Sequence, residues 1–468
     1  MTANQTLKVA WQMMEQSIIY YKNRPVGTVA ALDSTLPALN YHQCFTRDFV
    51  VSAIAFLFNG QSEIVRNFLT ETLALQAREK QMDCFKAGKG LMPASFEVIN
   101  RDGREHLEAD FGEKAIARVA PIDSGLWWLY LLRIYVKATG DEAFVCQPSV
   151  QQGIRLILDL LLSVHFEMMP TMLVPDGSFM IDRRMGVYGH PLDIQALFYA
   201  ALRSAQELLY SVSSEDVYRE AVESRLGHLL YHIRTYYWLD LDQLNVIYRY
   251  GVEEFGDDAI NKFNIYPDTI PDWLPEWLAN GNGYFAGNLG PGRIDYRFFT
   301  QGNLLAILTS LADEYQTTAI ANQIQQQWQD LVGLMPIKAC FPALTGKDWR
   351  TLTGCDPKNL PWSYHNGGHW PVLLWLLVAA MQKVGKGSLA YQALDIADSR
   401  LLRDQWMEYY DGRNGCLIGR QARKQQIWTV AGYIVAHQLL ENPSHIDALT
   451  FQINPMISCS LPEMINEF

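Results

Sequence analysis

Two carboxylic acids that lie far apart in the sequence have neighbours suited to acid and base chemistry. Asp182 lies in the segment VPDGSFMIDRRMGVYGHPLDIQ, on an extended stretch that follows an Asp-Gly turn and precedes a proline at a first helical position. The apolar residues around it indicate partial burial, and a desolvated carboxyl can have a raised pKa that suits a general acid. The arginines that follow it, Arg183 and Arg184, also allow a plain surface ion pair.

The second carboxylate, Glu408, lies among aromatic residues in the segment WMEYYDG. It either accepts a hydrogen bond from a tyrosine in a structural role or lines a sugar site, where rings stack on pyranose faces, and the sequence leaves both open. Hydrolysis of a glycosidic bond uses a pair of carboxyl groups in acid and base roles. Asp182 and Glu408 are therefore candidates for a general acid and a general base.

Other segments carry side chains that bind hydroxyl groups or stack on sugar rings. Gln421 and Arg423 are two apart in a segment that we expect to be extended, so they offer amide and guanidinium donors on one side. The segment DWRTLTGCDPKNLPWSYHNGGHWP gathers aromatic and polar residues, including His365 and Trp370, around a Gly-Gly pair. We expect this segment to form a polar and aromatic binding wall.

Two more carboxylates precede or begin apolar segments. Asp48 follows Arg47, a pattern that is less typical of a helix cap alone, whereas Asp123 is as well explained by a helix cap worth about 1 kcal/mol. If these groups converge with the aromatic wall, they form a carbohydrate pocket, with rings for sugar faces and carboxylates, amides and arginine for hydroxyls.

The motifs of several other chemistries are missing. The sequence contains no GxGxxG after a strand, no GxxxxGK[ST], no GxSxG, no HExxH and no HxE…PCxxC. His365 and His369 are four apart, but the glycines between them disfavour a shared helical face and no nearby carboxylate completes a metal site. The seven cysteines are widely spaced, which favours free thiols. We expect neither a metal ion nor a cofactor.

The elements that must position these residues follow from a pattern that occurs six times. A polar and aromatic cluster runs directly into a long apolar segment that fills most of a helix circumference, which is typical of a helix buried on nearly all sides. These apolar segments span residues 50–58, 126–135, 194–202, 304–312, 372–381 and 430–440. Amphipathic segments suited to an outer layer lie between them, at residues 63–79, 150–165, 214–236, 319–332 and 389–406.

Alternating buried and half-buried helices predict an all-α fold, an (α/α)6 toroid of six inner and six outer helices. The inner helices present their N-terminal ends together at one mouth, where long loops gather; these loops span residues 80–122, 166–190, 251–299, 340–368 and 405–426. No linker or low-complexity stretch divides the chain of 468 residues, so we expect a single domain over residues 1–468.

The composition limits the partners of the protein. Hydrophobic residues make up 49% of the chain, which is ample for a large core, and a net charge of -12 disfavours nucleic acid and anionic membranes as partners. No apolar stretch reaches the roughly 20 residues of a membrane span, and the first residues lack the pattern of a signal peptide. The sequence therefore predicts a cytoplasmic protein.

Several long motifs together resemble the neutral/alkaline invertases of cyanobacteria and plants. They are FTRDF, GLMPASF, DFGEKAIARVAPIDSGLWW, IDRRMGVYGHPLDIQALFYAALR, TGCDPKNLPWSYHNGG, WPVLLWLL, EYYDG and the IGRQAR to AGY segment, from about residue 20 to residue 440. The resemblance implies an (α/α)6 barrel that hydrolyses sucrose with inversion at the glucose anomeric carbon, without a cofactor. It assigns the general acid to Asp182 and the general base to Glu408, and it implies a homo-oligomer such as a hexamer.

Placement of the motifs gives a hypothesis for the sugar contacts. The glucosyl ring is expected to lie deepest, held by Arg47, Asp48, Asp123 and Gln195, with the fructosyl part toward His365, Gln421 and Arg423. Two alternatives stay open: another inverting α-glucosidase of the same architecture, such as a trehalase or an oligosaccharide glucosidase, and a sugar-binding toroid without catalysis. The chain departs from the plant pattern at His369, where a small residue is expected after HNGG, and at Asp193, where plant enzymes commonly have Glu.

Overall fold

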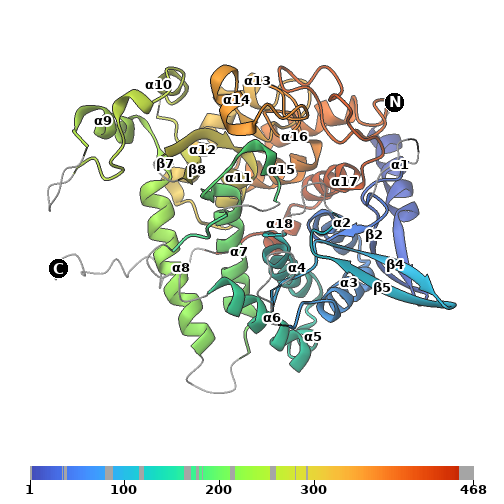
Figure 1. The fold of residues 1–468 in the computed structure, drawn as a ribbon. Helices are drawn as coiled ribbons and strands as arrows, with labels where there is room; N and C mark the ends of the chain where they lie inside the picture. Colours follow the sequence, from blue (N-terminus) through green and yellow to red (C-terminus); the bar gives the residue numbers. More distant parts are fainter. Residues whose placement is uncertain are drawn as a thin grey trace.

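A computed structural model gives the fold of the chain (Figure 1). The structure describes residues 3–33, 35, 40–79, 88–114, 121–162, 170–174, 179–181, 183–210, 217–252, 260–279, 281–290 and 293–452. Asp182, the predicted general acid, lies outside the described residues.

Six apolar helices form a ring, and each overlaps one of the predicted inner segments. They are α2 (Thr46–Phe58), α4 (Ser124–Thr139), α7 (Leu192–Leu208), α11 (Thr300–Leu308), α15 (Leu374–Lys383) and α17 (Ile427–Glu441). Helix α11 ends before residue 312, and α15 begins after residue 372. Each contacts the next one in the chain, and α17 contacts α2, so the ring closes. Because both flanks of every helix touch another helix, apolar side chains are needed almost all round.

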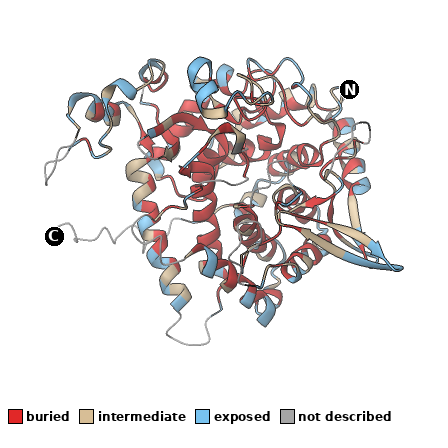
Figure 2. Ribbon diagram, in the orientation of Figure 1, coloured by how far each residue is buried: buried red, intermediate tan, exposed pale blue. Residues whose placement is uncertain are grey.

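A second layer of amphipathic helices covers this ring. It consists of α1 (Ala3–Gln16), α3 (Ser62–Ala74), α6 (Pro148–Leu161), α8 (Val217–Tyr236), α12 (Glu314–Gln326) and α16 (Gly387–Asp398). Figure 2 shows the ring helices almost wholly buried, whereas helices of the second layer, such as α8, carry exposed stretches. The prediction of a helix-rich double layer is confirmed, although α1, which packs on α17, was not among the predicted outer segments.

The structure also contains strands, which the prediction of an all-α fold did not include. One hairpin pairs β1 (Ile18–Tyr21) with β2 (Arg24–Thr28), and a second sheet has the order β3 (Cys44–Phe45), β4 (Ser95–Arg101), β5 (Arg104–Asp110). The third sheet runs β10 (Cys340–Phe341), β9 (Arg293–Phe299), β8 (Tyr284–Gly290), β6 (His190–Pro191), and β7 (Trp238–Leu239) also pairs with β8. All pairs are antiparallel.

The β4–β5 hairpin has a local cause in the sequence. Its turn is Asp102-Gly103, and both residues have positive φ, 53° and 74°. A two-residue turn with positive φ at both positions matches the twist of an antiparallel pair, and Asp-Gly is one of the sequences that adopt it most readily. The predicted long loop at 80–122 therefore contains a hairpin.

Short helices complete the described part of the chain. They are α5 (Glu142–Val145), α9 (Leu241–Arg249), α10 (Leu274–Trp277), α13 (Trp328–Leu331), α14 (Gly346–Thr353) and α18 (Ile446–Leu449), with single 3-10 turns η2 (Arg183–Met185), η3 (Pro267–Thr269), η4 (Pro371–Leu373) and η5 (Pro443–His445).

The segment that follows α17 crosses the C-terminal ends of the ring helices. Phe451 lies under the guanidinium of Arg133 at 3.8 Å and stacks on Tyr130 at 5.9 Å. Arg133, on α4, donates hydrogen bonds to the carbonyls of Ala448 and Thr450, and the Ser310 hydroxyl donates to the Phe451 carbonyl. This segment therefore ties the far end of α4 to the end of α11.

Candidate active site

The N-terminal ends of the ring helices meet at one end of the molecule. A small cavity of about 20 Å³ lies there, lined by Arg47 and Val51 of α2, Trp127 of α4, Gln301 of α11, Trp428 of α17, residues of η4 and α15, and Met180. The helix starts thus bring residues that are several hundred positions apart to one place, as expected for a toroid whose inner helices begin at a common mouth.

Arg47, Asp48 and Asp123 form one charged cluster at this mouth. The Arg47 guanidinium donates to the Asp123 carboxylate at 2.8 Å, and its Nε lies 3.7 Å from the Asp48 carboxylate. Asp123 precedes α4, but its carboxylate makes no capping hydrogen bond, so the simple helix-cap interpretation does not account for it. The buried carboxylate is instead held by the arginine of a neighbouring helix.

Burial controls the ionisation of these two acids. It raises the pKa of Asp48 to about 7, the Arg47 charge opposes this rise, and the carboxylates of Asp123 and Glu408 add to it. Burial likewise raises the pKa of Asp123, against the opposing effect of Arg47. The Glu408 carboxylate therefore lies near enough to Asp48 to affect its ionisation.

Glu408 is fixed by hydrogen bonds to both carboxylate oxygens. It is only 3% exposed, the Tyr41 hydroxyl donates to its Oε1 at 3.2 Å, and the Arg423 backbone N–H donates to its Oε2 at 3.3 Å. The Glu408 N–H in turn donates to the Arg423 carbonyl at 2.7 Å. Burial and the Glu408 charge raise the pKa of Tyr41 well above its usual value, so this phenol stays a hydrogen-bond donor.

A stack of rings lies beside Glu408. The Trp370 ring lies between His365, at 4.6 Å, and Tyr409, at 5.6 Å, and is nearly parallel to both, while Trp428 meets it edge-on at 5.7 Å. Tyr409 directly follows Glu408 in the chain, so His365 and Trp370 belong to the wall that carries the carboxylate.

Gln421 and Arg423 do not share one side of an extended segment, so that expectation is wrong. Gln421 is exposed at a turn and has a φ of 57°, in the left-handed region. Arg423 is half-buried, and its guanidinium lies over the Tyr41 ring at 4.9 Å from the ring centroid. Arg423 is therefore part of the Tyr41–Glu408 arrangement, whereas Gln421 lies at its edge.

Two polar residues at the start of α7 are engaged with neighbouring backbone. The Gln195 amide accepts from the Met172 N–H at 2.8 Å and donates to the Met172 carbonyl at 2.9 Å, so it holds residues 170–174 against the helix. Asp193 accepts from the Gly302 N–H at 2.7 Å, and burial raises the pKa of Asp193 to about 7.

The neighbours of position 182 are buried at the mouth. Met180, Ile181 and Met185 are each at most 3% exposed, and Met180 lines the cavity at the helix ends. Arg184 lies 3.8 Å from the Asp356 carboxylate, and its guanidinium lies over the Tyr364 ring at 6.0 Å. This arginine is therefore engaged with Asp356 and Tyr364.

The residues at the mouth that were missing from the predicted site include Tyr41, Gln301 and Trp127. Tyr41 bonds to Glu408, and Gln301 and Trp127 line the cavity. Gln301 and Trp127 lie at or just after the polar clusters that begin the ring helices, so the same pattern that singled out Arg47 contained them. Tyr41 has no such signal, because its bond to Glu408 joins residues 367 positions apart.

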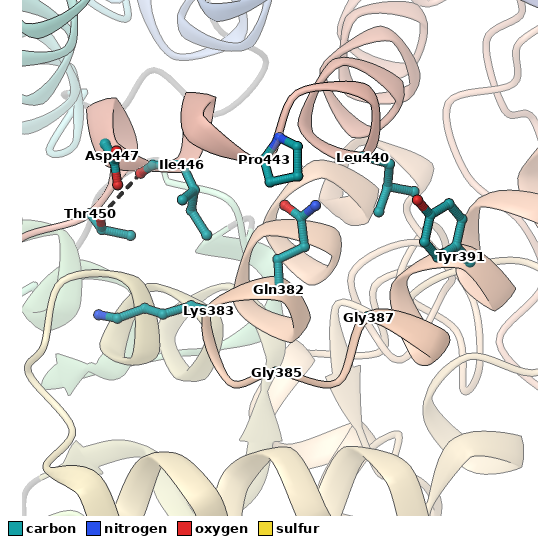
Figure 3. A pocket seen from close by; sticks show the side chains of 10 residues that line it. All are labelled: Gln382, Lys383, Gly385, Gly387, Tyr391, Leu440, Pro443, Ile446, Asp447 and Thr450. Carbon is teal, nitrogen blue, oxygen red and sulfur yellow. Dashed lines mark hydrogen bonds between the residues drawn. The ribbon is translucent and has the colours of Figure 1, made fainter.

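A different cavity lies at the opposite ends of α15 and α17. It holds about 560 Å³ and is lined by side chains that include Gln382, Lys383, Tyr391, Pro443 and Asp447 (Figure 3). The Lys383 ammonium is already bonded to the carbonyls of Ile307 and Leu308 and to the Ser310 hydroxyl. Tyr391 is the single aromatic side chain of its lining, so this cavity lacks the ring surfaces of a sugar site.

Within the described residues, no group of three or more His, Cys, Asp and Glu side chains has the arrangement of a metal site. A search of the same residues finds no helix that is both long and apolar enough to span a membrane.

Comparison with known proteins assigns this site to a family. The family model described as "Alkaline and neutral invertase" matches residues 10–443, which is most of the chain. The chain belongs to the alkaline and neutral invertases. Among its relatives, "Cytosolic invertase 1" of Oryza sativa is 53% identical over 95% of this chain and 79% of its own length. "Probable alkaline/neutral invertase D" of Arabidopsis thaliana is 52% identical over 95% of this chain and 84% of its own length.

The names of the invertase relatives refer to more than one cellular compartment. "Neutral/alkaline invertase 1, mitochondrial" of Oryza sativa is 53% identical over 93% of this chain and 71% of its own length. Among solved structures, the GH63 mannosylglycerate hydrolase from Thermus thermophilus in complex with Tris matches with a TM-score of 0.57 at 12% identity, over 92% of this chain and 99% of that chain. This likeness establishes a helix-rich glycosidase fold, and together with the family match it makes the invertase a glycoside hydrolase.

Proposed function

We propose that this invertase hydrolyses sucrose to glucose and fructose, with inversion at the glucose anomeric carbon. Membership of the invertase family is the observation that carries the proposal. The arrangement around Glu408 supports it, because a buried carboxylate stands beside stacked aromatic rings and a second charged cluster, as a sugar site requires.

Glu408 is the proposed general base and Asp182 the proposed general acid. Glu408 takes a proton from a water molecule whose oxygen bonds to the anomeric carbon, while the glycosidic carbon–oxygen bond breaks and Asp182 gives its proton to the fructosyl oxygen. Hydrogen bonds from Tyr41 and from the Arg423 N–H hold both Glu408 oxygens in one orientation. Asp182 is assigned from its position in the IDRRMG motif, and inversion requires about 6.5 to 9.5 Å between the two carboxyl groups.

The glucosyl hydroxyls are the proposed ligands of the Arg47–Asp48–Asp123 cluster. Asp48 has a pKa of about 7 and so offers both a donor and an acceptor near neutral pH, while Arg47 offers donors only. His365, Trp370, Arg423 and Gln421 are the proposed contacts of the fructosyl part. Gln195 is proposed to contribute less to glucosyl binding, because its amide oxygen and nitrogen are both bonded to the Met172 backbone.

The assignment is tested with Glu408→Gln and Asp182→Asn. Each is expected to lower kcat on sucrose by about 10²- to 10⁴-fold, since that is the usual contribution of a positioned acid or base. Glu314→Gln, at an exposed position in the first turn of α12, is the matched control and is expected to keep full activity. An unchanged rate in either test variant removes that residue from the role.

The stereochemistry and substrate are tested by proton NMR of the first product. Inversion releases β-glucose from the α-glucosidic bond of sucrose, and early formation of α-glucose contradicts the proposal. Parallel assays on trehalose and maltose separate an invertase from another inverting α-glucosidase of this fold. Faster glucose release from either of these sugars than from sucrose rejects sucrose as the substrate.

Finer features of the molecule belong to the same proposal. The ring and its cover are proposed to be an (α/α)6 barrel forming one catalytic domain over residues 1–468. The protein is proposed to be cytoplasmic, by likeness to the relative named as cytosolic, and to form a homo-oligomer such as a hexamer. Light scattering coupled to gel filtration tests the assembly, and a monomer at micromolar concentration rejects it.

A further inference from the structure

A large cavity lies between three segments that are distant in the sequence, and Trp362 from a fourth segment also lines it. It holds about 770 Å³ and is bounded by residues 265–273, by β9 and by residues 342–348 at the start of α14. None of its lining residues comes from α2, α4, α7, α11, α15 or α17, so it is separate from the cavity at the helix ends.

Aromatic rings follow one side of this cavity. Trp273 and Trp362 line it and are only partly buried, and Phe341 lies between them, at 6.5 Å from Trp273 and 6.0 Å from Trp362 between ring centroids. Trp277 stacks on Phe341 at 5.0 Å between ring centroids and so holds the Phe341 ring in place. Rings that are held in place and still partly open are suited to stack on the apolar faces of a sugar.

A buried hydroxyl on β9 has an unused hydrogen-bonding capacity. Tyr296 lines the cavity and is 5% exposed, and its hydroxyl has no hydrogen-bond partner among the described residues. The Thr269 side chain lies near enough to lower the pKa of Tyr296, against the larger raising effect of burial, but it does not reach hydrogen-bond geometry. An unmade hydrogen bond at a buried group costs about 1 to 3 kcal/mol, and a ligand hydroxyl at this place removes that cost.

The charges around the cavity favour a neutral ligand. Asp268 and Asp348 are exposed carboxylates, and Arg293 is an exposed guanidinium. Asp295 and Arg297 neutralise each other, since the Arg297 guanidinium donates to the Asp295 carboxylate at 2.5 Å. Because neither sign dominates, the lining is poorly suited to a phosphate or a metal ion, whereas its donors and acceptors match the hydroxyls of a sugar.

We propose that this cavity is a second saccharide site, which binds a neutral mono- or disaccharide outside the catalytic mouth. A sugar ring stacks on Trp273 or Trp362, one sugar hydroxyl bonds to the Tyr296 hydroxyl, and the carboxylates and Arg293 contact the remaining hydroxyls. Sucrose, glucose and fructose share this chemistry, and the proposal does not depend on the roles given to Asp182 and Glu408.

The site borders the proposed active site through Trp362. The Gly412 N–H donates to the Trp362 carbonyl at 2.7 Å, and the hydroxyls of Ser363 and Tyr409 lie 3.2 Å apart. Tyr409 is the neighbour of Glu408. The second site thus lies on the other side of the wall that holds the proposed base. The substrate and products of the proposed reaction are therefore the sugars present nearest to it.

The test uses the Glu408→Gln protein, in which turnover is suppressed, with sucrose, glucose and fructose titrated separately by calorimetry. At least one sugar is expected to bind at two classes of site. Adding Tyr296→Phe is expected to weaken one class about five-fold, the value of one hydrogen bond, while the melting temperature does not fall, because this hydroxyl has no partner to lose. Adding Trp273→Ala is expected to remove the same class. Tyr391→Phe, at the cavity of Figure 3, is the matched control and is expected to change neither class.

Crystals of the Glu408→Gln protein soaked in each sugar locate the site. Sugar density against Trp273 and within hydrogen-bond distance of the Tyr296 hydroxyl is the expected result. A single class of site, unaffected by Tyr296→Phe, with density only at the helix ends, overturns the proposal. If the unmodified enzyme fails to hydrolyse sucrose, the proposed function is rejected, but binding that depends on Tyr296 still establishes the second site, so the two failures are distinguishable.

Discussion

Glu408 depends on residues that lie far from it in the sequence. Its two oxygens are held by Tyr41, from the segment before α2, and by the backbone of Arg423, from the segment before α17. The Arg423 guanidinium also covers the Tyr41 ring. The hydroxyl of Tyr41 is therefore expected to position the carboxylate for its reaction and to add less to the stability of the fold.

Tyr41→Phe tests this positioning role. Loss of a hydrogen bond to a charged group is worth about 1.5 to 3 kcal/mol, so kcat on sucrose is expected to fall about ten- to hundred-fold, with little change in KM. Tyr20→Phe, at an exposed tyrosine, is the control and should keep its kcat. A fall in melting temperature with an unaltered kcat would instead assign Tyr41 a purely structural role.

Asp193 makes stability depend on pH in a direction that can be stated. Its pKa is raised from 3.8 to about 7, so between these values the folded protein binds a proton that the unfolded chain does not. The stability contributed by this group is therefore present at low pH and is lost as pH rises toward 7. Above pH 7 the buried carboxylate is charged, and only one of its oxygens has a partner among the described residues.

Asp193→Asn is expected to remove this dependence, because the amide stays neutral while its oxygen can still accept from Gly302. Relative to wild type, the variant should gain about 3 kcal/mol of unfolding free energy between pH 5 and pH 8. Denaturant unfolding at the two pH values measures the difference. If the gap between variant and wild type is the same at both, the raised pKa is wrong.

At the scale of elements, the ring helices were predictable and the strands were not. Helices with apolar residues all round, such as α15, have an unmistakable pattern, because both of their flanks contact other helices. Several strands are only two residues long and form by pairing with distant segments: β3, β6, β7 and β10. No local sequence pattern predicts them. The β4–β5 hairpin was an exception, since its Asp-Gly turn was present in the sequence.

The candidate site likewise contains residues whose grouping the sequence predicted and residues whose grouping it did not. Arg47, Asp48 and Asp123 lie at helix starts, and helix starts converge in a toroid, so their grouping followed from the helical pattern. Tyr41 and the turn at Gln421 depend on the path of loops, which tertiary contacts determine. Sequence periodicity carries no information about those contacts.

Two helical glycines are expected to respond to alanine with opposite signs. A Cβ on Gly432 of α17 would lie 2.8 Å from the Val372 carbonyl oxygen, which is backbone and cannot move aside, so Gly432→Ala should cost about 1 to 3 kcal/mol. A Cβ on Gly227 of α8 meets nothing within 4 Å, so Gly227→Ala should stabilise by up to about 1 kcal/mol through helix propensity. Thermal melts of both variants decide, and equal effects would contradict the close approach of α17 to η4.

At the scale of the whole molecule, the segment that follows α17 connects the C-terminal ends of α4 and α11. Phe451→Ala is expected to destabilise the protein by about 3 to 5 kcal/mol, because the ring packs on Tyr130 and under the Arg133 guanidinium. Tyr248→Ala, at a residue that is 70% exposed on α9, is the control and should change stability by less than about 0.5 kcal/mol. Denaturant unfolding measures both, and similar small losses would show that the segment contributes little.

The seam between α2 and α17 has a consequence for synthesis of the protein. The Gln438 side chain of α17 donates to the Ala55 carbonyl of α2, across 383 positions of the chain. At about 5 to 20 residues per second, a ribosome needs roughly 20 to 80 s after it has made α2 to complete α17. During that interval the flank of α2 that packs on α17 faces water or a chaperone, so expression yield in cells should respond to chaperone supply.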